Sequence, residues 1–335
     1  MRRVGENSIE YNNVYLLESS TISGPREKNA QLGKFIDKSY NELSCSEKTW
    51  EKAEIKLQNE AFLIALEKVN LKSEDIGLIL SGDLNNQIIA SSYMARKFNI
   101  PHIGLYGACS TAVLSIIVGA NYIENKIFNN VACLTSSHYA TSERQFRFPT
   151  EYGGQKPSST TTTVTGSGCS LLSTKKSNIK VTRATIGKVI DPNYKDVQDL
   201  GRAMAPAAAM TLRQHFEDFN VDASEYDLIL TGDLSECGSI VFKDILKEWG
   251  IEFYNYNDCG LMIYDRKVQE VFSGGSGCGC CSLILNGYIK EMLSTKKLNK
   301  VLIIATGALM NPLLAQQKES IPGIAHAIVL ESVME

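Results

Sequence analysis

One cysteine lies in a sequence pattern that suits a nucleophile. Cys109 follows the apolar run Ile103–Tyr106 and two small residues, Gly107 and Ala108, and a largely apolar stretch over residues 110–123 comes after it. This order predicts a strand, a tight turn and a helix that begins beside the sulfur. Because peptide dipoles at the start of a helix favour an anion, we expect a lowered pKa for the Cys109 thiol. The alternative is a buried cysteine that is retained because the turn is crowded.

The partners that such a cysteine needs for catalysis are scarce. Acyl transfer by a thiolate requires a general base and hydrogen-bond donors for an oxyanion. Among the histidines, His102 lies at the start of a predicted strand and His215 in a predicted helix, where we expect structural roles. His138 and His326 lie near predicted sheet ends. An acyl-transferring enzyme that recruits His138 or His326 as its base is therefore the alternative to a binding function.

Other polar residues could bind an anion instead. Arg144 and Arg147 lie among aromatic residues, and their planar guanidinium groups suit a carboxylate. The alternative is that these arginines tie their segment to the body of the protein or to a second subunit. His138 could donate to a carboxylate or cap the end of a strand. Backbone N–H groups at the helix start after Cys109, and among the glycines around Ser276, could form further anion sites.

Two Gly-Asp pairs end similar apolar runs, and Asp83 and Asp233 are their acidic members. If the ligand carries calcium, these carboxylates could complete the oxygen shell of the ion. We favour the alternative, in which each aspartate caps the helix that follows. The full candidate ligand-binding set is Asn86, Cys109, His138, Arg144, Arg147, Thr231, Asp233, Ser276 and His326. We expect no catalytic residue and no cofactor, apart from calcium that a ligand could carry.

The remaining composition argues against several other classes of site. Cys278, Cys280 and Cys281 lack a Cys-x-x-Cys pair, so close helix packing is favoured over a zinc site. An odd number of cysteines without an export signal predicts reduced thiols. We find no apolar run that would make a signal peptide or span a membrane. A net charge of −3 argues against a nucleic-acid partner.

The elements that must position these residues occur twice along the chain. Residues 74–84 recur as residues 225–234, and each copy is an apolar run that ends in Gly-Asp. An amphipathic helix is predicted before each copy, over residues 50–69 and 203–219. A strand, a turn, an apolar helix and a further strand then follow in the same order in both halves. We therefore predict an α/β fold with two βαβ halves, residues 1–177 and 178–335, related by a pseudo-twofold axis.

The two predicted halves also indicate where a ligand pocket lies. Strands that alternate with helices predict mainly parallel sheets, and ligands of such sheets bind beyond the carboxyl ends of the strands. Both Gly-Asp turns and the Gly107-Ala108-Cys109 turn lie at such ends. We therefore expect a pocket where the two halves meet. Residues 139–165 are an insertion of loop character that only the first half contains.

A cysteine on a strand-to-helix turn, in a duplicated α/β chain of this length, resembles the thiolases and β-ketoacyl synthases. Longer strings narrow the resemblance to the stage V sporulation protein AD family of endospore-forming bacteria, namely Ser23–Lys28, Ser136–His138, Glu143–Pro157 and Met204–Ala209. The resemblance implies a thiolase-like fold with helices and sheets layered αβαβα. The related enzymes use His or Asn from two loops of the second half, where this chain has Thr231–Asp233 and Gly274–Gly277. We therefore expect Cys109 to lack its base and the chain not to be an enzyme.

The resemblance to this spore family also implies a function. It implies binding of dipicolinic acid, alone or as its calcium chelate, and movement of that compound into the developing spore and out again on germination. It implies a peripheral partner of integral membrane proteins encoded alongside it, at the cytoplasmic face of the spore inner membrane. Relatives of this fold are commonly dimers, so a homodimer is expected by analogy. A third possibility is a structural partner of those membrane proteins with a vestigial pocket.

Overall fold

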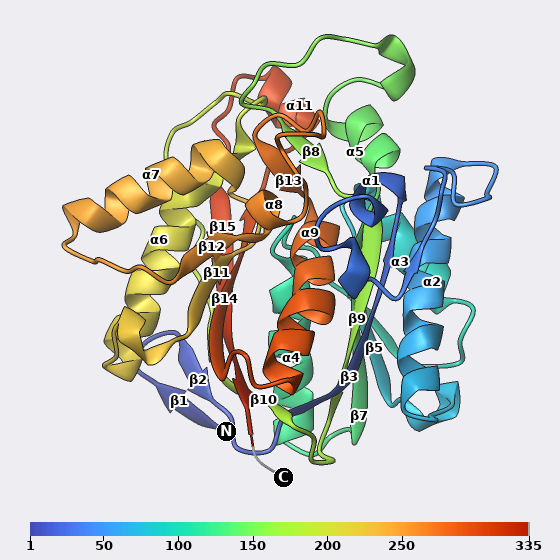
Figure 1. Cartoon of the computed structure of the whole chain (residues 1–335), viewed down its shortest axis with the longest axis vertical. Coiled ribbons are helices and arrows are strands. Elements are labelled where there is room, and N and C mark those ends of the chain that lie inside the picture. The colour runs from blue at the N-terminus through green and yellow to red at the C-terminus, as the bar shows by residue number, and fades with distance from the viewer. Residues whose placement is uncertain (334–335) are drawn as a thin grey trace.

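Each half of the chain forms a sheet with the same strand order. The computed structural model describes residues 1–333. The first-half order is β6 (His102–Gly104), β5 (Leu78–Gly82), β7 (Asn130–Ser137), β9 (Gly166–Ser173) and β3 (Tyr15–Ser23). The second-half order is β12 (Tyr256–Asp258), β11 (Leu228–Thr231), β14 (Lys300–Ala308), β15 (Gly323–Ser332) and β10 (Ile179–Thr185). The predicted duplication is confirmed, with β5 and β11 as equivalent strands (Figure 1).

The strand directions match between the halves, but they correct the expectation of mainly parallel sheets. β5 runs parallel to β6 and β7, and β11 runs parallel to β12 and β14. β9 is antiparallel to β7 and β3, and β15 is antiparallel to β14 and β10. The sheets are mixed because the chain leaves β7 and re-enters β9 at the same end of the sheet, as it does between β14 and β15.

The two sheets join between β3 and β10, through the register pair Tyr15 and Lys180. A hairpin of β1 (Arg2–Val4) and β2 (Ser8–Glu10) adds to β10, so the first residues of the chain lie against the second half. The boundary predicted between residues 177 and 178 falls just before β10 and stays a prediction.

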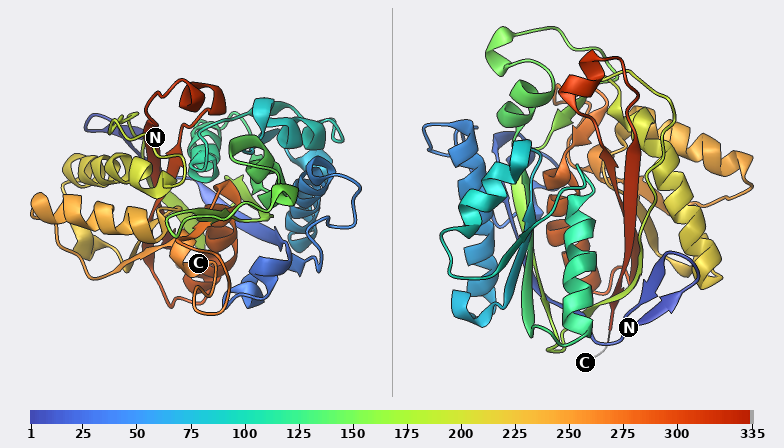
Figure 2. Two further views of the ribbon diagram at one scale, coloured as in Figure 1. Left: turned by 90° about the horizontal axis from the view of Figure 1, so that it is seen from above. Right: turned by 180° about the vertical axis from the view of Figure 1, so that it is seen from behind.

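Helices fill the space between the sheets and cover their outer faces (Figures 1 and 2). The inner helices are α4 (Thr111–Glu124) and α9 (Cys278–Leu283), which continues into the π-helical η6 (Ile284–Ile289) and α10 (Lys290–Ser294). The outer helices are α2 (Trp50–Lys68) and α3 (Ile89–Ala95) on the first half, and α6 (Leu200–Phe219) and α7 (Ser235–Glu248) on the second. α4 contacts β7 and β14, and is apolar around most of its circumference because protein covers it on nearly all sides. This arrangement has the expected αβαβα layers.

Local sequence signals account for where the long outer helices begin. The Thr49 hydroxyl accepts the N–H of Lys52 at the start of α2, and the Asp199 carboxylate accepts the N–H of Arg202 at the start of α6. Within residues 1–333, no helix has both the length and the apolar composition needed to cross a bilayer. The remaining elements are β4 (Lys38–Ser39), β8 (Thr161–Thr163), β13 (Gly274–Ser276), α1 (Pro25–Lys28), α5 (Tyr139–Phe146), α8 (Cys259–Met262), α11 (Pro312–Gln316), η1 (Gly33–Phe35), η2 (Ser73–Asp75), η3 (Asn86–Ile88), η4 (Thr150–Tyr152) and η5 (Ala223–Glu225).

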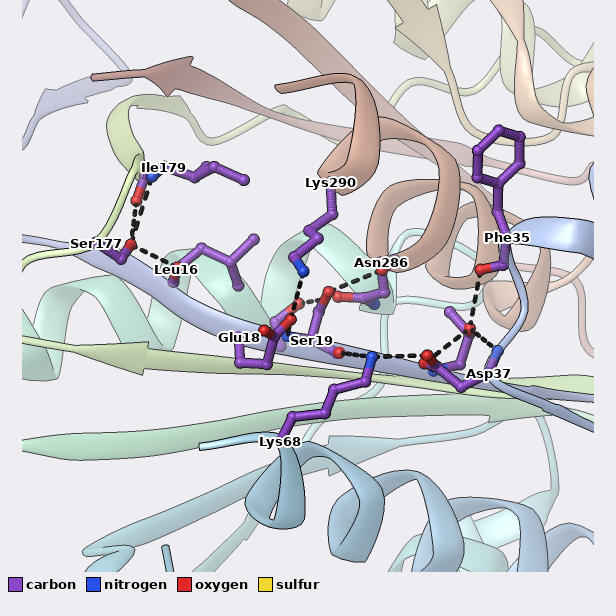
Figure 3. Close-up of polar contacts among 12 residues, drawn as sticks. Leu16, Glu18, Ser19, Phe35, Asp37, Lys68, Ser177, Ile179, Asn286 and Lys290 are labelled. Carbon is purple, nitrogen blue, oxygen red and sulfur yellow. Dashed lines mark hydrogen bonds and ion pairs between the residues drawn. The ribbon is translucent and has the colours of Figure 1, made fainter. Parts of the chain in front are cut away.

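Polar contacts fix β3 between an outer helix and the inner layer (Figure 3). Lys68 of α2 donates to the carbonyl of Ser19 at 2.8 Å, while the Ser19 hydroxyl donates to the carbonyl of Asn286 in η6 at 2.7 Å. Glu18 pairs with Lys290 at 2.7 Å. These contacts satisfy polar groups that would be costly to bury alone, and they hold the register of the layers that carry the site.

The insertion over residues 139–165 is more ordered than its composition predicted. It contains α5, the short turn η4 and β8, which pairs in parallel with β13 of the second half. The expectation of a purely loop-like insertion is therefore wrong. Pairing of Thr161 with Gly274, far apart in the sequence, carried no local signal that could have revealed the strand.

Candidate functional site

Cys109 lies on a strained turn between β6 and α4. Ala108 has a φ angle of 49°, a left-handed conformation that costs a residue with a side chain about 1 kcal/mol. The Ser110 hydroxyl closes the turn by donating to the carbonyl of Gly107 at 2.6 Å. Gly307 of β14 packs against the same carbonyl so closely that a Cβ there would lie 2.5 Å from its oxygen. The predicted strand-turn-helix arrangement is present, and the second-half sheet braces it.

A carboxylate from the second half contacts the sulfur. Asp233 follows β11 and has only 1% of its surface exposed. Its carboxylate accepts hydrogen bonds from the Thr306 hydroxyl at 2.7 Å and from the Gly277 N–H at 2.8 Å, and it lines the same cavity as the Cys109 thiol. Burial raises the pKa of Asp233 to about 6, although these hydrogen bonds oppose the rise. The contact joins the two halves at the predicted meeting point.

The expectation of a reactive thiolate at Cys109 is wrong. Cys109 keeps some accessible surface, but the protein that encloses it raises the pKa of the thiol well above its usual value. The charge of Asp233 raises this pKa further, and the Gly277 N–H opposes the rise only in part. These effects outweigh the helix start, so near neutral pH the sulfur is a neutral thiol beside Asp233.

The two Gly-Asp turns differ in what they do. Asp83 accepts the N–H of Ser91 in the first turn of α3 at 2.8 Å, as a helix cap does, and this expectation is confirmed. Asp233 does not cap α7, which corrects the second expectation. Asp258, at the end of β12, accepts the N–H of Leu234 at the start of α7 at 2.9 Å instead. The carboxylate of Asp233 is therefore available to contact Cys109.

Arg147 is a cation that lines the same cavity as Cys109 and Asp233. It ends α5 and only 6% of its side chain is exposed. One terminal nitrogen donates to Glu143, one helical turn earlier, at 2.8 Å, and Glu143 also pairs with Lys156 at 2.7 Å. The Nε atom of Arg147 is buried and has no acceptor among the described residues. A buried guanidinium N–H without an acceptor is costly, so an anion that reached it would be stabilised.

Two spaces adjoin Arg147. The inner cavity, about 40 Å³, is lined by Cys109, Asp233, Ser276 and Arg147, together with apolar side chains such as Leu84. It has room for about three water molecules. The outer hollow, about 480 Å³, lies beneath residues 147–156 and is also lined by Arg147. Arg147 therefore forms a wall that the two spaces share.

Aromatic and cationic groups line the outer hollow. Phe148 and Tyr152 stack with their ring centroids 5.0 Å apart, and both are largely exposed. Lys156 lies over the ring of Tyr139, 4.8 Å from its centroid. Flat aromatic surfaces beside Lys156 and Arg147 suit a flat aromatic anion, because they offer stacking and charge to the same ligand.

Neither of the histidines proposed as a base lies at the sulfur. The Nδ1 atom of His138 accepts the N–H of Ala140, and its Nε2 donates to the carbonyl of Leu43 at 2.8 Å. The Nδ1 atom of His326 accepts the N–H of Gly187 at 3.2 Å. Burial lowers the pKa of both imidazoles to about 4. The structure does not bring either residue to the inner cavity, and the expected ligand contacts of both have no support in this geometry.

Three other candidates also lie elsewhere. Arg144 pairs with Glu51 and lines a separate surface depression together with Asn86. The Thr231 hydroxyl donates to Asp258 at 2.7 Å within the second half. Of the predicted set, the structure thus gathers Cys109, Arg147, Asp233 and Ser276 around one cavity.

Cys278 and Cys280, from the cysteine cluster considered as a zinc site, pack against backbone carbonyl groups. The Cys278 thiol donates to the carbonyl of Ser136 at 2.8 Å, and the Cys280 thiol points to the carbonyl of Gly232. Sequence reasoning missed Glu143 and Lys156 as partners of the site. The four-residue spacing of Glu143 and Arg147 on a predicted helix was the available signal for their ion pair.

The family model described as stage V sporulation protein AD matches residues 5–331. A relative from Bacillus subtilis (strain 168), stage V sporulation protein AD, is 48% identical over 319 residues, which cover 95% of this chain and 94% of the relative.

Solved structures of enzymes share the fold. A variant of OleA from Xanthomonas campestris has a TM-score of 0.62 at 10% identity and covers 96% of this chain and 99% of its own. The 3-oxoacyl-[acyl-carrier-protein] synthase III of Aquifex aeolicus has a TM-score of 0.52 at 13% identity over 98% and 100% of the two chains. Human mitochondrial 3-ketoacyl-CoA thiolase has a TM-score of 0.57 at 10% identity over 96% and 98%. At such identities the likeness concerns the fold alone, and it confirms the expected thiolase-like fold.

Proposed function

We propose a ligand-binding function for this chain, which belongs to the stage V sporulation protein AD family. In this proposal it binds dipicolinic acid or its calcium chelate without chemical turnover. In this proposal the protein serves uptake of the compound into the developing spore and its release in germination. It acts as a peripheral subunit of a membrane channel at the cytoplasmic face of the spore inner membrane, with integral membrane proteins encoded alongside it. A homodimer is part of the same proposal.

The buried guanidinium group of Arg147 carries the proposal. Dipicolinate is a flat pyridine ring with two carboxylates, so its site needs charge-assisted donors and a narrow space for the ring. Arg147 has an Nε–H without an acceptor within residues 1–333, and it lines both the inner cavity and the outer hollow. A carboxylate of the ligand would satisfy this N–H and supply a second partner for the guanidinium group.

The geometry at the sulfur supports binding without turnover. The acyl-transfer alternative needs a base that takes the Cys109 proton. The four histidines make hydrogen bonds to other groups. Asp233 contacts the thiol, but burial raises the pKa of Cys109 well above that of Asp233, so proton transfer to the carboxylate is uphill.

Entry of a ring requires the site to widen. The inner cavity of about 40 Å³ is too small for a pyridine dicarboxylate, whereas the outer hollow of about 480 Å³ is not. Because Arg147 lines both spaces, we infer that a shift of its side chain away from Glu143 joins them. We therefore place the bound ring across the position that the Arg147 side chain now occupies, with one carboxylate on its guanidinium group.

Thermal unfolding with dipicolinate tests the proposal directly. A ligand that binds only the native chain must raise the melting temperature, and at a concentration of about 100 times Kd it adds about 2.7 kcal/mol of stability. We expect this rise with dipicolinate, with and without calcium. Absence of any shift in both conditions would favour the vestigial-pocket alternative and sink the proposal.

A pair of arginine variants locates the site. The double variant Arg147→Met with Glu143→Gln removes the proposed ligand contact without leaving the buried Glu143 charge unpaired. We expect it to weaken binding by about tenfold to a hundredfold, the value of one charge-assisted hydrogen bond. Arg144→Met is the matched control, because Arg144 lies in the same helix but lines another depression. Equal losses in both variants would place the ligand outside the inner cavity.

A further inference from the structure

The charge balance of the inner cavity is poor for an anionic ligand. The charged residues that line it are Asp233 and Arg147. In the proposed complex the Arg147 guanidinium group binds the ligand carboxylate, and Lys156 remains the partner of Glu143. Among the described residues the Asp233 carboxylate has only neutral hydrogen-bond partners, namely the Thr306 hydroxyl and the Gly277 N–H. A ligand carboxylate that enters this cavity therefore meets a buried carboxylate whose charge no cation offsets.

Two like charges in one buried space cannot both be retained without a large penalty. The usual resolution in proteins is that one carboxyl group keeps a proton and donates it to the other in a hydrogen bond. Either the ligand or a protein group must then carry the proton. The carboxyl groups of an aromatic dicarboxylate are more acidic than a buried carboxyl group, so the proton resides on the protein.

The groups that face Asp233 identify the proton carrier. Cys109 faces it from the turn before α4, and Cys278 and Cys280 face it from α9. Burial raises the pKa of all three thiols well above the usual value, so they stay neutral and offer no charge change. Asp258 faces it from the end of β12. Three backbone N–H groups and the Thr231 hydroxyl occupy the Asp258 carboxylate, which does not line the inner cavity.

We propose that Asp233 takes up one proton when an anion occupies the inner cavity, and that its carboxylic acid group then donates a hydrogen bond to the ligand carboxylate. This inference rests on the proposed function and assigns to Asp233 the role of matching the cavity to an anion. The proton comes from solvent and forms an O–H bond on the carboxylate, and it returns to solvent when the ligand leaves. No other bond forms or breaks.

The consequence is a pH-dependent affinity. In the free protein the pKa of Asp233 is raised to about 6, so the carboxyl group is mostly ionised above that pH. Binding then requires a proton, and linkage makes Kd rise about tenfold for each pH unit above about 6. Below about 6 the proton is already present and Kd becomes independent of pH. A site of this kind binds the anion tightly in mildly acidic surroundings and releases it as the pH rises.

Titration calorimetry of the full chain with dipicolinate tests the inference. At about pH 7, phosphate and imidazole buffers differ in heat of ionisation, so the difference in measured enthalpy reports protons taken up per ligand bound. We expect an uptake near one proton per ligand for the natural chain. Asp233→Asn keeps a donor without a charge, and we expect it to bind with no proton uptake and with the same Kd from about pH 6 to about pH 8.

The matched control is Asp258→Asn, which removes a buried carboxyl group that does not line the cavity and should leave proton uptake unchanged. Binding by the natural chain with no proton uptake and a constant Kd would overturn the inference and leave the proposed function intact. Absence of binding by the natural chain at every pH would instead count against the proposed function. The buffer comparison on the natural chain decides the inference even if Asp233→Asn does not fold.

Discussion

The ion pair between Glu143 and Arg147 offers a quantitative test of how the candidate site is built. Only 3% of the Glu143 side chain and 6% of the Arg147 side chain are exposed, so water screens the pair very little. Removal of one member of a buried pair typically costs about 3 to 5 kcal/mol. Lys156 also pairs with Glu143, at 2.7 Å, so we expect Glu143 to keep a partner after loss of Arg147. We therefore expect Arg147→Met to destabilise the chain by about 2 kcal/mol, below that range.

A double-mutant cycle isolates the pair. Glu143→Gln removes the carboxylate that pairs with the buried Arg147 charge, and no second one replaces it among the described residues, so we expect a loss of about 3 kcal/mol. The double variant has neither unpaired charge, so its loss should be smaller than the sum of the single losses by about 2 kcal/mol. Equilibrium urea unfolding, followed by circular dichroism and fluorescence with coincident transitions, measures each value.

The exposed pair of Arg144 and Glu51 provides the control for this cycle. Its side chains are 50% and 28% exposed, and surface pairs of this kind contribute less than about 1 kcal/mol. We expect a coupling of at most about 0.5 kcal/mol from Arg144→Met and Glu51→Gln. If the losses at Glu143 and Arg147 add within about 0.5 kcal/mol, the buried pair does not have the assigned strength and the argument from burial fails.

Three further outcomes follow from the same structure. Burial lowers the pKa of His138 to about 4, so its contribution to stability is present above about pH 6.5 and is lost as the pH falls through 4. The natural chain should therefore lose stability between neutral and acid pH, as measured by urea unfolding. In His138→Gln this loss of stability should be smaller by about 3 kcal/mol. Asp233→Asn should speed alkylation of Cys109 by iodoacetamide about tenfold at mildly alkaline pH, because it removes the Asp233 charge that adds to the effect of burial on the thiol pKa. An unchanged rate would contradict the closeness of Asp233 to Cys109. Gly277 has a φ angle of 97°, and a Cβ there would lie 2.6 Å from the Ser137 hydroxyl oxygen, so Gly277→Ala should lower the free energy of unfolding by about 3 kcal/mol. The control is Gly153, which has a φ angle of 65° but open space around it, so Gly153→Ala should lower the free energy of unfolding by only about 1 kcal/mol.

Much of the fold could be predicted from local pattern. The apolar runs that end in Gly-Asp gave β5 and β11 in their correct positions, and the helix predicted over residues 50–69 is α2, Trp50–Lys68. Burial imposes these periodicities on each segment separately, so they are visible in the sequence. The direction of β9 and β15 and the pairing of β8 with β13 were not visible, because they depend on which distant strand supplies the hydrogen bonds.

The sequence by itself determined that a cysteine stands on a turn before an inner helix, and that arginines follow within an insertion of the first half. Only the tertiary structure decided that Asp233 meets Cys109, and that Arg147 lines the cavity while Arg144 does not. The physical reason is that residue type and local spacing define an element and its faces, whereas these contacts depend on how β11, α4 and α5 pack together. The same packing buries the thiol, which is why the pKa of Cys109 is raised where the helix start alone predicted a lowered value.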